Sequence, residues 1–361
     1  MFPESEFKVR RTRVRENLAE LDVDALVVTA LLNIRYLTGF TGSNGILLLT
    51  PSREILFTDP RYTVQSKRET SCRVRTVKGP TLAAVAKAIN RLRLRKTGFE
   101  YHTIPFHIYT FLNQGLRPGG SLVPTRNLVE TLRMIKSPVE IDAIRRAVET
   151  NSKAFSKVLP TIRPGLGERR IAADLEYQMR RLGGDGPAFD TIVASGSRAA
   201  LPHARPTSKS VEANQLLLID MGTIQDGYTS DMTRTIFLGR PTHKWKKSYQ
   251  AVLQAQLAAI DAIRDGVPTA RPDQKARKVL KSHGLDKAFT HSTGHGLGLE
   301  IHEEPRLGKR DRNKLRAGMV VTVEPGIYLE GGGGIRIEDT VLVTPTGCEI
   351  LTPTGKELTV I

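Results

Sequence analysis

The chain has 361 residues, which predicts two domains, and its 39% hydrophobic and 25% charged residues exclude a disordered or fibrous protein. The net charge of +17 is spread along the chain and aromatic residues make up only 6%, so a nucleic-acid partner is disfavoured. No apolar run approaches the roughly 18 residues of a membrane span, and the two widely separated cysteines exclude a disulfide scaffold and favour the cytoplasm.

The first third of the chain alternates short apolar runs with amphipathic stretches. We expect helices and strands in turn: helices over 7–21 and 81–94, and strands over 25–29, 45–50 and 54–58. Short buried strands that alternate with amphipathic helices are typical of an α/β domain. Residues 1–133 are therefore expected to form a smaller, N-terminal α/β domain.

A capping box marks the start of the second domain. Ser137 can cap a helix, Pro138 suits the first helical position, and Glu140 lies three residues after the cap. Apolar residues then recur at helical spacing until Pro160. We expect a long helix here, which opens a second domain that comprises residues 134–361.

The rest of the second domain combines further helices with grouped strands. We expect helices over 167–182 and 246–264, and strands over 216–221, 233–238, 320–323, 335–337 and 341–343. Helices followed by grouped strands indicate an α+β layer rather than a parallel sheet with crossover helices.

Several acidic residues stand at the ends of predicted buried strands. Asp220 lies at the end of one apolar run, and Glu324 and Glu338 directly follow two others. A carboxylate at such a position is costly unless it is paired or binds a metal ion. A hairpin would bring Asp231 beside Asp220, and His295 lies in a predicted glycine-rich loop where backbones can approach closely.

Four carboxylates and one imidazole thus form a candidate metal site: Asp220, Asp231, His295, Glu324 and Glu338. Four unpaired carboxylates in one place would repel too strongly to remain ionised, whereas two divalent cations neutralise their charge. Oxygen ligands with one imidazole favour Mn²⁺ or Co²⁺, with Zn²⁺ as an alternative. Two metal ions about 3.5–4 Å apart are typical of hydrolytic sites.

Short segments that contain these residues follow one another along the chain: 219–222, 228–235, 291–296, 324–328 and 334–339. Together with 33–43 and 135–141, they resemble the motifs of the aminopeptidase P/prolidase family. The resemblance covers nearly the whole chain. It implies a metallopeptidase with a pita-bread catalytic domain, residues 134–361, preceded by a smaller creatinase/prolidase-type α/β domain, residues 1–133.

The resemblance also implies how the metal ligands are shared. Asp220, Asp231 and Glu338 would bind one divalent ion, and Asp231, His295, Glu324 and Glu338 would bind the other. Asp231 and Glu338 would therefore bridge the two ions, for which Mn²⁺ is the favoured metal. Glu324 would also accept a proton from the attacking water.

Further residues are implied to contact the substrate. His203 and His302 would be catalytic residues close to the scissile bond, and His291 would form part of the wall of the proline pocket. Arg336 would orient a carboxylate or bind substrate. Tyr228 either lines the same cleft or only packs in the core.

The function implied is hydrolysis of the bond before proline, which lacks an N–H group and which general peptidases handle poorly. We favour an Xaa-Pro aminopeptidase over an Xaa-Pro dipeptidase, because 36–43 is more similar to bacterial aminopeptidase P. A dipeptidase would need a cation for the free carboxylate, and Arg306, Arg310 and Arg312 are the candidates. Dimers are common in this family, so the resemblance implies a homodimer that acts on proline-containing peptides.

Other members of the same fold are alternatives. Methionine aminopeptidases share the metal motifs but usually lack an N-terminal domain of this size. Creatinases have both domains but are metal-independent and do not keep the five ligands. A catalytically inactive binding module would have lost ligands as well, and this chain keeps all five.

Overall fold

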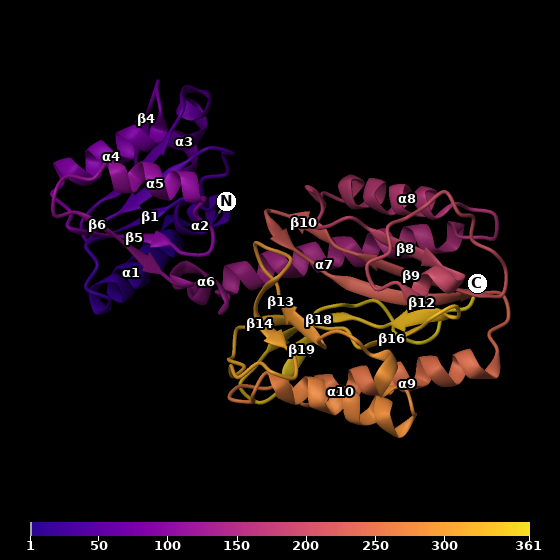
Figure 1. The fold of residues 1–361 in the computed structure, drawn as a ribbon. Coiled ribbons are helices and arrows are strands. Elements are labelled where there is room, and N and C mark those ends of the chain that lie inside the picture. Colours follow the sequence, from indigo (N-terminus) through magenta and orange to yellow (C-terminus); the bar gives the residue numbers. More distant parts are fainter. Residues whose placement is uncertain (1) are drawn as a thin grey trace. The chain divides into compact units, whose positions relative to one another are not determined.

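The computed structural model describes residues 2–361, and the chain divides into two compact units, Met1–Arg133 and Met134–Ile361 (Figure 1). The first unit contains one mixed sheet with the strand order β4-β3-β2-β1-β5-β6. Its strands are β1 (Ala25–Val28), β2 (Ile46–Leu49), β3 (Glu54–Thr58), β4 (Arg73–Thr76), β5 (Lys96–Glu100) and β6 (Ser121–Thr125). Its helices are α1 (Glu4–Glu20), α2 (Leu31–Thr38), α3 (Thr63–Glu69), α4 (Thr81–Arg91), α5 (Phe106–Gln114) and α6 (Leu128–Arg133).

The centre of this sheet is apolar on both faces. All four residues of β1 are buried, and so are those of β2, which explains why both read as continuous hydrophobic runs. β1 is parallel to β5 and antiparallel to β2. The predicted α/β domain is therefore present, with the strand and helix ends shifted by a few residues from their expected positions.

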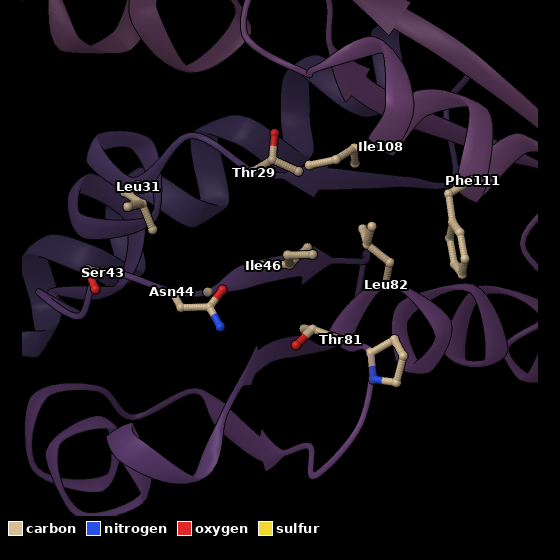
Figure 2. A pocket seen from close by; sticks show the side chains of 11 residues that line it. Thr29, Leu31, Ser43, Asn44, Ile46, Thr81, Leu82, Ile108 and Phe111 are labelled. Carbon is tan, nitrogen blue, oxygen red and sulfur yellow. The ribbon is translucent and has the colours of Figure 1, made fainter.

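A pocket of about 390 Å³ lies in the first unit, and Figure 2 shows its lining. Residues beside β1 and β2 and residues of α4 and α5 surround it: Thr29, Leu31, Ser43, Asn44, Gly45, Ile46, Pro80, Thr81, Leu82, Ile108 and Phe111. None of these lining residues is ionisable, so the pocket lacks groups for acid–base chemistry. The chemistry predicted from the motifs belongs to the second unit.

The second unit begins with α7 (Pro138–Val158), at the predicted capping box. The backbone N–H of Ser137 donates to Oε2 of Glu140 at 3.0 Å, as a capping box requires. The further helices are α8 (Glu168–Arg181), α9 (His243–Asp261) and α10 (Ala270–Ser282). Figure 1 shows α7 and α8 on one side of the strands and α9 and α10 on the other.

The strands of this unit form small antiparallel sheets, among them β12-β9-β8, β14-β13-β15-β18-β19 and β16-β17. The strands are β7 (Gly186–Pro187), β8 (Ile192–Ser195), β9 (Gln215–Met221), β10 (Thr223–Gln225), β11 (Tyr228–Thr229), β12 (Met232–Leu238), β13 (Gly294–Gly296), β14 (Glu303–Leu307), β15 (Val320–Val323), β16 (Gly326–Leu329), β17 (Gly333–Arg336), β18 (Asp339–Val343) and β19 (Cys348–Ile350). Antiparallel sheets between helices agree with the predicted α+β class.

Two apolar cores enclose the strands. Phe155 of α7 and Leu175 of α8 pack with Ile219 of β9 in one core, and Val252 of α9 packs with Val321 of β15 in the other. Most of the strands that carry or adjoin the candidate ligands contribute residues to these two cores, which fixes the positions of those strands. Over residues 2–361, none of the helices has the length and apolarity that crossing a bilayer requires.

Candidate metal centre

Strands β9 and β12 position the two aspartates. They pair antiparallel, with Asp220 opposite Thr233, and Asp231 directly precedes β12. The predicted hairpin is more elaborate than expected, because β10 and β11 form a small hairpin of their own between the two aspartates. The turn of that hairpin is Asp226-Gly227, and both residues have a positive φ, of 53° and 81°.

His295 lies in strand β13, so its predicted position in a loop is wrong. The glycines around it serve strand packing rather than loop flexibility. A Cβ at Gly294 would lie 1.9 Å from the carbonyl oxygen of Thr322, in the neighbouring strand β15. Glycine at this position therefore lets the strand that carries the imidazole approach the strand that leads to Glu324.

The five predicted ligands lie in or directly beside strands from separate parts of the chain. Asp231, His295 and Glu338 each offer one atom within 4.8 Å of the others, which is close enough for one cation to bind all three. Nε2 of His295 lies 3.6 Å from Oδ2 of Asp231 and 3.5 Å from Oε1 of Glu324. Asp220 belongs to the same group of charges, since it raises the pKa of Asp231 and of Glu338.

The hydrogen bonds around the candidate ligands leave several of their lone pairs available to a metal ion. Nδ1 of His295 lies 3.0 Å from the carbonyl oxygen of Gly296, which can only accept, so Nδ1 carries the proton and the lone pair of Nε2 faces the carboxylates. Oδ2 of Asp220 and Oε2 of Glu338 each accept a hydrogen bond, while Asp220 Oδ1 and Glu338 Oε1 are buried without a partner among the described residues. Orphaned buried oxygens next to a free imidazole nitrogen fit a divalent cation.

The pKa values of these groups reflect burial and mutual repulsion. Burial, and then the charges of Glu338 and Asp220, raises the pKa of Asp231 well above its usual range. Burial and the charge of Glu324 do the same to Glu338, and burial raises the pKa of Glu324 to about 7. Burial lowers the pKa of His295 to about 4, so its imidazole is neutral at pH 7. A cation would relieve the repulsion between the carboxylates and bind the neutral imidazole.

These shifts predict how the stability of the metal-free protein depends on pH. Glu324 has a pKa of about 7 when folded and about 4.3 when unfolded, so within this range only the folded state holds the proton. Stability therefore falls as the pH rises, whereas each buried histidine, with an unfolded pKa of about 6.5, has a smaller opposite effect that ends only near pH 7.5. We expect the free energy of unfolding to fall from pH 6.5 to pH 8, by about 1 kcal/mol from Glu324 alone.

Urea unfolding of the chelator-treated protein at these two pH values measures the effect. Glu324→Gln is the matched variant, and it should show a smaller decrease because one titrating carboxylate is gone. Saturating Mn²⁺ should remove the decrease, since a bound cation keeps the carboxylates ionised at both pH values. Equal or greater stability at pH 8 in the metal-free protein would contradict the electrostatic account.

The predicted substrate histidines lie around this group of ligands. The ring of His302 is exposed and stands edge-on to the ring of His295, with the centroids 4.4 Å apart. His203 is also exposed, and its charge lowers the pKa of both His302 and His291, which places the three imidazoles near one another. Exposed imidazoles beside the candidate ligands can contact a molecule that enters from solvent.

Arg336 donates a hydrogen bond to one of the carboxylates of this group. Its Nη2 donates to Oδ2 of Asp220 at 2.6 Å, and its Nη1 donates to the hydroxyl oxygen of Tyr328 at 2.7 Å. That hydroxyl in turn lies 2.8 Å from Nε2 of His291, whose Nδ1 faces the carbonyl oxygen of Ser292. His291 therefore accepts from the phenol and sits at the end of a hydrogen-bond chain that reaches Asp220.

Tyr328 is a site residue that the sequence reasoning missed. The signal in the sequence was its place at the end of the segment 324–328, and in the structure it is the penultimate residue of β16. The hydroxyl of Tyr228, by contrast, donates to Oε1 of Glu140 at 2.8 Å, so of the two alternatives for Tyr228 the structure supports packing. Arg306 lies opposite His295 in the β13–β14 pair and is exposed.

Comparisons with known proteins agree with this geometry. Residues 142–345 match the model of metallopeptidase family M24, and residues 10–135 match the creatinase/prolidase N-terminal domain. The chain is 36% identical over 350 residues to an Xaa-Pro dipeptidase from Pyrococcus horikoshii, with 96% of this chain and 97% of that protein covered. The chain belongs to metallopeptidase family M24, within the aminopeptidase P/prolidase group, as the sequence motifs predicted.

Solved structures lead to the same family and fold. An Xaa-Pro dipeptidase from Bacillus anthracis superposes with a TM-score of 0.96 at 38% identity, covering 98% of this chain and 100% of that one. An X-Pro aminopeptidase from Thermotoga maritima superposes with a TM-score of 0.91 at 37% identity, with the same coverage. The predicted pita-bread catalytic domain, preceded by a smaller creatinase/prolidase-type domain, is thereby confirmed.

Proposed function

We propose that the protein is an Xaa-Pro dipeptidase that uses two divalent metal ions. The observation that carries the proposal is the buried group of four carboxylates and one neutral imidazole, with orphaned oxygens on Asp220 and Glu338. Relatives named Xaa-Pro dipeptidase support this activity better than the aminopeptidase activity favoured in the sequence analysis. The proposed ligands remain those of the sequence analysis, Asp220, Asp231, His295, Glu324 and Glu338, with Mn²⁺ as the favoured metal.

The reaction divides among the residues around these ligands. A divalent cation in such a site supplies Lewis-acid activation of water and of the scissile carbonyl. Glu324, whose pKa is raised to about 7 by burial, accepts the proton of the attacking water and can return it near neutral pH. His203 and His302, both exposed, donate hydrogen bonds to the substrate on either side of the scissile bond.

Two other residues hold this arrangement in place. Arg336 keeps Asp220 oriented through the 2.6 Å ion pair. His291, fixed between the hydroxyl of Tyr328 and the carbonyl of Ser292, forms a wall of the proline pocket. Since neither imidazole nitrogen of His291 is left for proton transfer, its proposed role is to shape the pocket.

Substrate length is proposed to depend on Arg306. Its charge lowers the pKa of both His295 and His302, so the guanidinium lies within electrostatic reach of the site. An exposed cation at this position can bind the free carboxylate of the proline in an Xaa-Pro dipeptide. Arg310 and Arg312 are exposed as well, but neither is among the main causes of the pKa shifts of these histidines.

An Xaa-Pro dipeptide, its C-terminal amide and an Xaa-Pro-Yaa tripeptide, compared at saturating Mn²⁺, test this proposal. We expect kcat/KM to be highest for the dipeptide, and Arg306→Met to lower it about tenfold or more, mainly through KM, because a charge-assisted contact is lost. Arg310→Met is the matched control and should behave as the wild type. Equally efficient cleavage of the tripeptide would instead support the aminopeptidase, an activity named for the Thermotoga maritima structure.

The proposal also covers the oligomeric state of the enzyme and its compartment. We infer a homodimer in the cytoplasm, acting on proline-containing peptides. The two cysteines, Cys72 and Cys348, are both free, which agrees with a reducing compartment. The homodimer rests on the family resemblance, and light scattering of the purified chain would test it.

A further inference from the structure

Arg234, in β12, lies directly behind the proposed metal ligands and uses all five of its N–H donors. Its Nη1 donates to the carbonyl oxygens of Thr233, at 2.9 Å, and Glu338, at 2.5 Å. Its Nε and Nη2 donate to three further oxygens: Oδ1 of Asp339 (2.8 Å) and the carbonyl oxygens of Thr354 (2.6 Å) and Gly355 (2.8 Å). One guanidinium thus connects β12, the segment of Glu338 and the C-terminal segment of the chain.

Asp339 receives this guanidinium and a second cation. The carboxylate is fully buried, and its Oδ2 accepts from Nε2 of Gln256 at 2.8 Å and contacts the ammonium of Lys356. That ammonium also donates to Oε1 of Gln256 at 3.3 Å. Two cations share one carboxylate, so the group of Arg234, Asp339 and Lys356 carries a net charge of +1.

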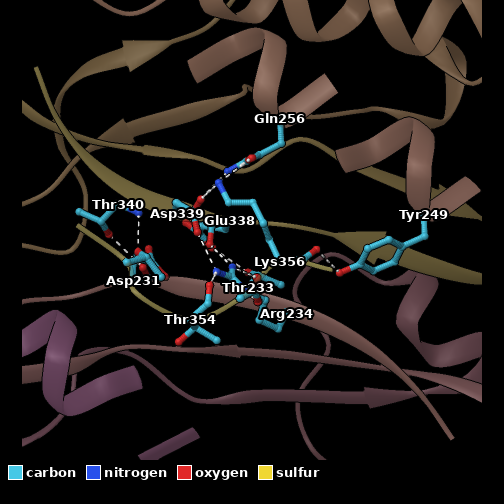
Figure 3. Close-up of polar contacts among 12 residues, drawn as sticks. Asp231, Thr233, Arg234, Tyr249, Gln256, Glu338, Asp339, Thr340, Thr354 and Lys356 are labelled. Carbon is cyan, nitrogen blue, oxygen red and sulfur yellow. Dashed lines mark hydrogen bonds and ion pairs between the residues drawn. The ribbon is translucent and has the colours of Figure 1, made fainter. Parts of the chain in front are cut away.

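The same group contacts the main chain of Glu338 directly and that of Asp231 through Thr340, the neighbour of Asp339 in β18 (Figure 3). Arg234 binds the carbonyl oxygen of Glu338, whose N–H donates to the carbonyl oxygen of Thr233 at 3.1 Å. Thr340, next to Asp339, donates its hydroxyl to the carbonyl oxygen of Asp231 at 2.9 Å. Each bridging carboxylate is therefore attached to backbone that these contacts position.

The C-terminal segment makes further hydrogen bonds to the rest of the unit. The hydroxyl of Tyr249, in α9, donates to the carbonyl oxygen of Lys356 at 2.9 Å. The backbone N–H of Phe237, in β12, donates to the carbonyl oxygen of Thr359 at 2.9 Å. Hydrogen bonds from α9 and β12 therefore hold the backbone of the segment that carries the ammonium of Lys356.

We propose that Arg234, Asp339 and Lys356 form a positioning cluster that holds the backbone of Asp231 and Glu338 for metal binding. The C-terminal residues 354–356 are in this way part of the metal centre, although none of them is a ligand. The inference rests on the proposed metal ligands. Metal affinity depends on how well ligands are held before the ion binds, and residues one contact removed from the ligands commonly change it by 10–100-fold.

Lys356 gives the sharpest test because it lies at the edge of the cluster, with 19% of its side chain exposed. Lys356→Met removes the ammonium but keeps an unbranched side chain of similar length. Lys356→Arg restores a cation, and Lys281→Met, on the last turn of α10, makes the same charge change at an exposed position. The full-length chain, depleted of metal by dialysis against a chelator, is titrated with MnCl₂ in a calorimeter, and thermal unfolding is followed by circular dichroism.

We expect Lys356→Met to raise the Kd for Mn²⁺ about tenfold at a temperature where it is fully folded. Lys356→Arg should recover most of the affinity, and Lys281→Met should match the wild type. Tyr249→Phe, which loosens the same segment but keeps the ammonium, should produce a smaller loss. These results together would support a positioning role, because a purely structural role would lower the melting temperature without changing the Kd.

Wild-type Mn²⁺ affinity in folded Lys356→Met would overturn the positioning cluster and leave the metal centre intact. A different result would overturn both: if the wild-type chain itself bound no Mn²⁺, the proposed ligands would be wrong. A loss of affinity in Lys281→Met equal to that in Lys356→Met would also contradict the inference, since net charge alone would then explain the change.

Discussion

Asp231→Asn and Glu338→Gln are each expected to abolish hydrolysis of Xaa-Pro substrates while the chain stays folded. Both residues are proposed to bridge the two metal ions, and both lie within 4.8 Å of the ligand atom of His295. Even residues that only support metal ligands change activity by about 10–100-fold, so loss of a bridging ligand should cost more than about 100-fold. Turnover with saturating Mn²⁺ and metal content by elemental analysis measure the effect.

Stability provides an independent measurement on the same variants. Burial and neighbouring carboxylates raise the pKa of Glu338, so ionisation of this carboxyl group is unfavourable in the folded, metal-free wild type. Glu338→Gln has no carboxyl group to ionise and should therefore melt at the same temperature as the metal-free wild type or higher. Glu330→Gln, at an exposed position, serves as the control for the loss of one carboxylate. Near-normal turnover in Asp231→Asn or Glu338→Gln, with metal retained, would refute the bridging role.

His203→Ala and His302→Ala are expected to lower turnover by about 100-fold or more while both metal ions stay bound. Loss of one hydrogen-bond donor to the reacting group costs about 10²–10³-fold in kcat, and neither imidazole is proposed as a ligand. Both side chains are exposed, so removing them should leave the fold and the buried carboxylates unchanged. Steady-state kinetics with an Xaa-Pro dipeptide and elemental analysis of the same samples measure the two effects separately.

The matched control is His243→Ala, an exposed histidine at the start of α9, which should keep wild-type turnover. Metal loss in His203→Ala or His302→Ala would mean that the ligand set includes one of these imidazoles. Unchanged turnover with both metals bound would instead place the histidine outside the reaction.

Local features of the fold follow from short stretches of sequence. The capping box at Ser137 begins α7 because a carboxylate three residues after the cap can reach back to the backbone N–H. Buried strands such as β3 and β15 have the bounds expected from their apolar runs, since burial on both faces needs an uninterrupted run. Helix ends differ by a few residues, as for α9, because an apolar pattern does not include the polar first turn.

Other features depend on residues that are far apart in the chain. His295 belongs to a strand because β14 and β15 pair with β13, and the sequence of β13 itself does not predict that pairing. Tyr328 becomes a site residue only when β16 and β17 bring its hydroxyl against Arg336 and His291. Arg234 and Lys356 are 122 positions apart by their numbers and meet on Asp339.

The sequence by itself determined the family, the two-part organisation and the identity of the candidate ligands, because motifs of specific residue types in a specific order carry that information. Only the tertiary structure decided which oxygens stay without a partner, which nitrogen of His295 faces the carboxylates and which basic residue lies near the site. These properties depend on the distances between side chains on strands from separate parts of the chain, and on how deeply each side chain is buried. Coulomb energies and desolvation depend on such distances, and no local pattern records them.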